Sequence, residues 1–134
     1  MSVEQSRESL LEREKRELFA KASSELAKDF QVRRTGYSAD ESKAQAAVIL
    51  ESRWRTAQGQ YRSILGSMSI PPYEEEVDFR QQVNAQRMQE LWDELEKLFM
   101  TDNLKGNGRP EEPRMSEATA KELVILLTKV NKYR

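Results

Sequence analysis

The sequence predicts an all-α protein with four helices, and three observations carry that prediction. Glycine and proline are few, 5 and 4 in 134 residues, and most of them cluster at three places that divide the chain into helix-length segments. Apolar residues recur at helical spacing within those segments. No stretch of strand length alternates convincingly between apolar and polar residues. We therefore expect one helical domain over residues 1–134, in which a long antiparallel hairpin of the second and third helices forms part of a bundle.

A long, charged N-terminal helix or arm is expected over residues 1–34. The residues of its inner face recur at close to four-residue spacing: Leu11, Leu18, Ala22, Leu26 and Phe30. Few apolar residues precede Leu18, so the first half is expected to be either a solvent-exposed helix or an arm that orders on a partner. Gly36 is placed to end this helix.

The helical hairpin is expected over residues 38–100. Its first helix begins at Ser38, because Ser38 and Glu41 fit a capping box. The apolar residues that follow recur with spacings of 3 and 4 for three heptads, which is typical of a seam between packed helices: Ala47, Leu50, Trp54, Ala57, Tyr61, Ile64 and Met68. Gly59 lies inside this helix, where glycine costs roughly 1 kcal/mol relative to alanine. It therefore predicts close approach by the backbone of another helix.

The third helix is expected to start at Pro72, with acidic residues in its first turn. Its predicted apolar face is made by Val77, Asn84, Met88, Leu91, Leu95 and Leu98. Trp54 and Trp92 are both expected in the core, since a tryptophan at helical spacing usually packs inside. A flexible loop over 101–115 and a short final helix over 116–134, capped by Ser116, complete the expected fold.

The missing residue types exclude most catalytic plans. The chain has no histidine and no cysteine, which rules out imidazole acid-base chemistry, thiolate nucleophiles and Cys/His metal sites. A magnesium site made of carboxylates alone, at Glu90, Asp93 and Glu94, is conceivable, but a solvated charged face explains these residues better. The glycines of the 101–115 loop lack the spacing of a phosphate-binding loop. We expect no enzyme, no catalytic or metal-binding residues, no cofactor and no small-molecule substrate.

The apolar pattern instead favours a self-associating structural or assembly protein of the coat, filament or scaffold type. Charged residues make up 34% of the chain, against roughly 25% in an average soluble domain, and the apolar residues are concentrated into narrow lines. Such lines are typical of helices that pack against other helices over a long distance. A homo-oligomer or a helical protein partner is therefore expected. The residues predicted to make this contact are Leu11, Leu18, Leu50, Trp54, Ala57, Tyr61 and Ile64.

Two alternative functions stay open from the sequence. The first is a nucleic-acid-binding or packaging subunit that contacts phosphates through Arg33, Arg34, Arg53, Arg55 and Arg62. The net charge of -1 and the pI of about 5.7 argue against it, because dedicated nucleic-acid-binding domains are usually basic. The second alternative is a small helical adaptor or assembly chaperone.

The sequence shows no membrane or targeting segment. Its longest apolar runs, Ala46–Leu50 and Leu123–Leu127, fall far short of the roughly 20 residues that span a bilayer. The first residues are charged throughout and lack the apolar stretch of a secretory signal. We expect no membrane contact, and a site of action inside the cell or in a particle assembled there.

Overall fold

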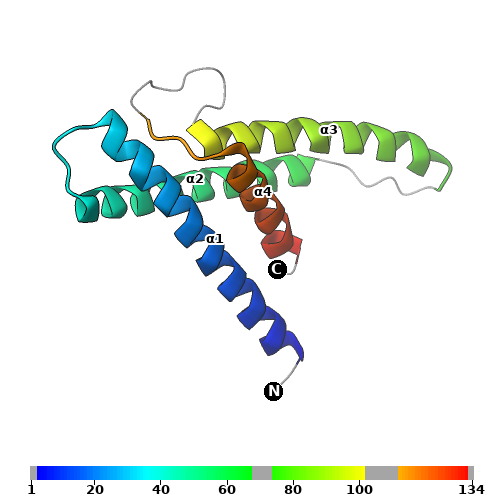
Figure 1. The fold of residues 1–134 in the computed structure, drawn as a ribbon. Coiled ribbons are helices and arrows are strands. Elements are labelled where there is room, and N and C mark those ends of the chain that lie inside the picture. The colour runs from blue at the N-terminus through cyan, green and yellow to red at the C-terminus, as the bar shows by residue number, and fades with distance from the viewer. Residues whose placement is uncertain (1–2, 68–73, 102–111, 133–134) are drawn as a thin grey trace.

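The computed structural model describes residues 3–67, 74–101 and 112–132, and every regular element in these ranges is a helix (Figure 1). The helices are α1 (Val3–Arg33), α2 (Ala39–Ser67), α3 (Glu74–Thr101) and α4 (Glu117–Lys132). The prediction of an all-α chain with four helices is therefore confirmed for the described ranges. Met68, Pro72 and most of the predicted 101–115 loop lie outside the described residues. So do the side chains of Ile64, Val77, Asn84 and Met88.

The helix ends follow from local capping chemistry. The Ser38 hydroxyl accepts a hydrogen bond from the backbone N–H of Glu41 at 3.1 Å, as predicted for the start of α2. Ser116 caps α4 in the same way, accepting from the backbone N–H of Thr119 at 3.2 Å. Beyond the end of α1, Gly36 adopts a φ of 94°, a conformation that L side chains rarely take.

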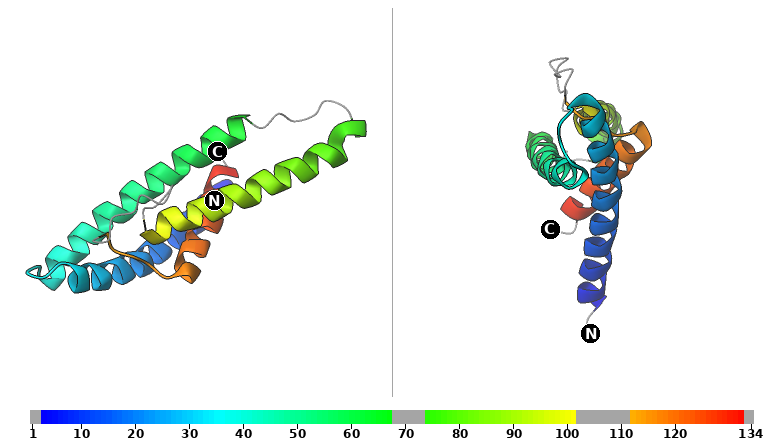
Figure 2. Two further views of the ribbon diagram at one scale, coloured as in Figure 1. Left: turned by 90° about the horizontal axis from the view of Figure 1, so that it is seen from above. Right: turned by 60° about the vertical axis from the view of Figure 1, so that its left-hand side comes forward.

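Each of the four helices packs against two others. In Figures 1 and 2, α2 and α3 lie side by side and run in opposite directions, while α1 and α4 cross them. α2 contacts both α1 and α3, and α4 contacts both α3 and α1. The first turns of α1 extend past the other helices (Figures 1 and 2).

Trp54 of α2 lies at the centre of the core. Its ring centroid is 5.2 Å from that of Phe19 on α1, in an edge-to-face arrangement, and 6.2 Å from that of Phe99 on α3. The three rings connect three helices that are distant in sequence. Around them lie the fully or almost fully buried aliphatic residues of all four helices, among them Leu26, Leu50, Leu95, Leu98, Leu123 and Leu127.

A strip of polar contacts joins α1 to α4. Glu14 pairs with Lys129 at 3.1 Å, and Lys21 pairs with Glu122 at 3.2 Å. Because residues 14 and 21 are seven apart, both contacts lie on one face of α1. This face turns toward α4, while the apolar face of α1 turns toward α2.

The same strip continues to the start of α4, where carboxylates of α1 hold the backbone. Glu25 accepts hydrogen bonds from the backbone N–H of Ser116, at 2.8 Å, and from the hydroxyl of Thr119. Asp29 accepts from the backbone N–H of Arg114 at 2.6 Å. A negative charge at a helix N-terminus is favourable, so Glu25 both caps α4 and fixes it against α1.

The structure corrects the prediction for Gly59. A Cβ atom added at Gly59 would meet nothing within 4 Å, so no described backbone approaches this position. The glycine lies on the outer face of α2, whereas the packing contacts of α2 use its other face, which carries Ala46, Leu50 and Trp54.

Candidate interaction surface

Most of the described part of the α2 heptad seam lies inside the chain, but its first predicted residue, Ala47, is exposed, and Ala46 is buried instead. Leu50, Trp54, Ala57 and Tyr61, four of the residues predicted to contact a second chain, are all buried against α1 and α3. Leu11 and Leu18 on α1 are half-buried, and Leu18 packs against the edge of the core. The side chain of Ile64 lies outside the described residues. A second copy cannot reach the buried seam in this fold, so a contact between copies has to use other surfaces.

Arg53 serves the core instead of a surface. Its side chain is 1% exposed, and its two terminal nitrogens donate to the backbone carbonyls of Phe99, at 2.8 Å, and Pro113, at 2.7 Å. Phe99 lies in the last turn of α3, where carbonyls have no partner within the helix and a cation is favourable. Arg53 therefore ties α2 to the end of α3 and to the segment before α4. It is not accessible to a phosphate group.

The other four arginines of the predicted phosphate-binding set are not gathered into one basic surface. Arg33 pairs with Asp29 at 2.5 Å, and Arg34 lies over the ring of Phe30, with its guanidinium carbon 5.4 Å from the ring centroid. Arg55 pairs with Glu51 at 3.7 Å on the exposed face of α2. Arg62, on α2, is also exposed. Arg33 and Arg34 precede the start of α2 at residue 39. Arg55 lies about 24 Å along α2 from that start, at a rise of 1.5 Å per residue.

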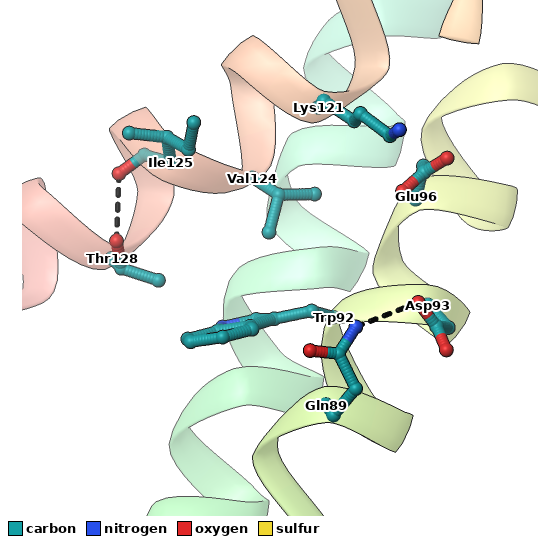
Figure 3. A pocket seen from close by; sticks show the side chains of 8 residues that line it. All are labelled: Gln89, Trp92, Asp93, Glu96, Lys121, Val124, Ile125 and Thr128. Carbon is teal, nitrogen blue, oxygen red and sulfur yellow. Dashed lines mark hydrogen bonds between the residues drawn. The ribbon is translucent and has the colours of Figure 1, made fainter. Parts of the chain in front are cut away.

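A hollow of about 370 Å³ lies between α3 and α4, and its floor is apolar (Figure 3). Trp92 of α3 lies opposite Val124 of α4, and Ile125 lies on the next position of α4 (Figure 3). The polar residues that line the hollow are Gln89, Asp93, Glu96, Lys121 and Thr128. Trp92 is 40% exposed and Ile125 is 54% exposed, so both present apolar surface to solvent.

The exposure of Trp92 corrects the sequence prediction, which placed both tryptophans in the core. Trp54 is 3% exposed and confirms its part of that prediction. Trp92 is next to the buried Leu91 but points along the face of α3 that borders α4. Val124, Ile125 and Thr128 of α4 line the same hollow as the indole, and 40% of Trp92 stays exposed.

Ile125 also borders a second hollow, of about 330 Å³, between α4 and α1. That hollow is lined mainly by the charged residues Glu14, Glu17, Lys21 and Glu122. Its members already pair across the two helices, as in the contact of Lys21 with Glu122. The hollow between α3 and α4 is thus the more apolar of the two.

A carboxylate pair lies at one end of the hollow between α3 and α4. Partial burial and a hydrogen bond with Glu117 raise the pKa of Glu96 above its usual value. Hydrogen bonds with Lys121 and then with Glu96 lower the pKa of Glu117, and Lys121 lies 3.3 Å from the Glu117 carboxylate. The pKa values of the two carboxyl groups are therefore shifted in opposite directions.

The carboxylates considered for metal binding do not form a site. Glu90 and Glu94 are exposed on α3, and Asp93 accepts a hydrogen bond from the Gln89 amide at 3.2 Å. Within residues 3–67, 74–101 and 112–132, no group of three acidic side chains is placed to hold a metal ion. Within the same ranges, no helix is both long enough and apolar enough to pass through a membrane.

Sequence reasoning missed the hollow, although one signal for it exists. Trp92 and Ile125 are large apolar residues beside, not on, the main apolar stripe of their helices, whereas Val124 belongs to that stripe and is buried. Comparison with known proteins adds no information about this surface. No protein-family model matches the sequence, and no curated protein or solved structure is significantly similar to it.

Proposed function

We propose that the protein is a non-enzymatic, self-associating helical subunit of a larger assembly, such as a coat, filament or scaffold. Within this proposal the chain is a helical hairpin with an N-terminal arm, and it acts inside the cell or in a particle assembled there. The proposal rests on surfaces suited to contact with another helix.

The observation that carries the proposal is the exposed part of α1. The first turns of α1 extend past the other helices (Figure 1), and Leu10 on this part is 61% exposed. Among the described side chains of α1, Glu14 pairs with Lys129, and the ammonium of Lys15 lies 5.0 Å from the Trp54 ring centroid, while Leu11 just before them is half-buried. An isolated helical extension of this length is marginally stable in water, so a helix here gains stability from a partner surface.

Sedimentation velocity of the full chain tests the proposal. Over a micromolar concentration range, we expect the weight-average mass to rise above 15.6 kDa as the concentration increases. A constant monomer mass across the range would overturn the proposal.

The same experiment addresses the nucleic-acid alternative. A DNA or RNA duplex added at about 50 mM salt is expected to leave the sedimentation of the protein unchanged, because Arg53 is buried and Arg33 and Arg55 have acidic partners. A complex that weakens steeply with added salt would favour nucleic-acid binding instead.

A further inference from the structure

We propose that the hollow between α3 and α4 binds the first turns of α1 from a second copy of the chain, with Leu10 as the apolar anchor. This inference rests on the proposed function, since it names the surfaces through which the copies associate. It joins two exposed apolar residues, Leu10 of α1 and Ile125 of α4.

The hollow has the make-up of a site for a helix. Trp92, Val124 and Ile125 supply the apolar floor, and charged and amide side chains supply the edge. An apolar centre with a polar rim is typical of a protein contact, and tryptophan is enriched among residues that dominate binding energy. A helix laid into an apolar groove is also a common form of recognition.

The first turns of α1 fit this hollow in length. Residues 3–13 precede Glu14, the residue that pairs with Lys129 of α4, and span about 16 Å at 1.5 Å per residue. The hollow extends along α3 from Gln89 to Glu96, which is about 10 Å. The projecting part of α1 is therefore long enough to cover the whole hollow.

The charges on the two surfaces are complementary. Arg13 is three residues after Leu10, so the two side chains lie on the same face of α1, and both are exposed. Asp93 and Glu96 border the hollow on α3. With Leu10 seated on Trp92 and Ile125, Arg13 is placed to pair with these carboxylates.

The α1 helix that fills the hollow has to come from another copy. Within one chain, α1 contacts the side of α4 that carries Glu122 and Lys129, whereas Lys121 and Val124 face the hollow. The first turns of α1 then continue away from α3 (Figure 2). Because the two contacting surfaces differ, the contact is head-to-tail, and repeated contacts give rings or filaments.

Complementing variants test this arrangement. Leu10→Ser removes the anchor and Ile125→Lys blocks the hollow, and each variant alone is expected to sediment as a monomer. Each keeps the surface that the other has lost. An equimolar mixture is therefore expected to form a heterodimer and no larger species, with α1 of the Ile125→Lys chain bound to the hollow of the Leu10→Ser chain.

Two matched variants serve as controls. Val32→Ser changes an exposed apolar residue at the other end of α1, and Val48→Lys changes one on the outer face of α2. Both are expected to associate like the unchanged chain. Thermal unfolding followed by circular dichroism checks that all four variants are folded.

A charge exchange tests the register of the contact. Arg13→Asp and Asp93→Arg are each expected to weaken association by about two- to fivefold at low salt, as for an exposed ion pair. The double variant carries both changes in every chain and is expected to recover most of the loss. Absence of recovery would overturn the pairing of Arg13 with this edge of the hollow.

The outcomes separate this inference from the proposed function. If the unchanged chain associates and the Leu10→Ser and Ile125→Lys variants associate equally well, the docking inference is wrong and self-association stands. If both variants are monomers but their mixture forms no heterodimer, the head-to-tail contact is wrong. If the unchanged chain is a monomer throughout, both proposals fall.

Discussion

Arg53 is a charged residue that holds the core together. Its guanidinium donates to two carbonyls from segments 46 and 60 residues away in sequence. Those carbonyls lie at the end of α3 and before the start of α4, where helix hydrogen bonds are missing. A planar group with several donors can serve both at once, which a lysine cannot do with the same geometry.

Replacing Arg53 is expected to destabilise the fold strongly. Arg53→Ala leaves two buried carbonyls without a donor and opens a cavity, so we expect the free energy of unfolding to fall by roughly 3 kcal/mol or more. Urea denaturation measures this change. Arg55→Ala, on the exposed face of the same helix, is the matched control and is expected to change the free energy by less than about 0.5 kcal/mol. Equal effects of the two substitutions would contradict the structural role of Arg53.

Glu25 makes the stability of the protein depend on pH. Burial disfavours its charged form, but hydrogen bonds from Thr119 and Ser116 outweigh that effect and lower the pKa of Glu25 below its usual value. A carboxylate whose pKa is lower in the folded state stabilises the fold above its unfolded pKa. That stabilisation is lost as the pH falls through the folded pKa.

Glu25→Gln is therefore expected to lower the free energy of unfolding at pH 7 by about 1 kcal/mol, the usual value of a helix cap. The difference from the unchanged chain should disappear in acid, because the carboxyl is then protonated in both states. Urea denaturation at pH 7 and near pH 3 measures both values. Glu17→Gln is the control, and an equal loss in that variant would remove the special role of Glu25.

The features of single residues that could be predicted from the sequence are those that depend on local chemistry. Ser38, Ser116 and Gly36 act on backbone groups within a few residues, so the sequence contains everything needed to assign them. The role of Arg53 depends on partners far along the chain, and no local pattern records that distance. Arg53, which is next to the seam residue Trp54 in the sequence, was therefore included among the possible phosphate contacts although it is buried.

At the scale of helices, substitution by alanine is expected to have opposite effects on stability at Gly36 and at Gly59. Gly36 has a φ of 94° and open space around its Cβ position, so only backbone strain opposes a side chain there. Gly59 also has open space but lies inside α2. Only its low helix propensity distinguishes it from alanine.

Gly36→Ala is expected to lower the free energy of unfolding by about 1–2 kcal/mol, the usual penalty of a left-handed residue with a Cβ atom. Gly59→Ala is expected to raise it by roughly 1 kcal/mol. Thermal or urea unfolding of the two variants, measured side by side, checks both signs. A loss of stability in Gly59→Ala would indicate a packing contact at that position.

Helix packing sets the limit of sequence prediction at this scale. The seam of α2 was recognised as a packing surface, since its spacing is visible in the sequence. Whether its partner is another part of the chain or another copy is not encoded in that spacing, and here α1 and α3 cover it. Trp92 was misplaced for the same reason, because its exposure depends on where α4 lies.

At the scale of the whole molecule, folding and association use different parts of α1. Glu14 pairs with Lys129 of α4, and Phe19 packs on Trp54 of α2. Of the apolar side chains described before Glu14, Leu10 is 61% exposed and Leu11 is half-buried, and neither belongs to the core cluster.

Removing residues 1–10, which takes away the exposed Leu10 and keeps the half-buried Leu11, is therefore expected to abolish self-association while changing the free energy of unfolding by less than about 0.5 kcal/mol. Sedimentation and urea denaturation measure the two properties separately. A longer deletion, of residues 1–21, also removes Phe19 and Lys21 and is expected to destabilise the fold. If the shorter deletion unfolds the protein, the first turns belong to the folded core.

The contrast between the two tryptophans gives the molecule a built-in optical reporter. Trp54 is enclosed and Trp92 is open to water, and the chain has no other indole. A neutral quencher such as acrylamide reaches the emission of Trp92 far more easily than that of Trp54. Tryptophan fluorescence of one unlabelled sample can thus report two events. Protection of Trp92 from the quencher indicates that the hollow between α3 and α4 is covered, and exposure of Trp54 to the quencher indicates that the core has unfolded.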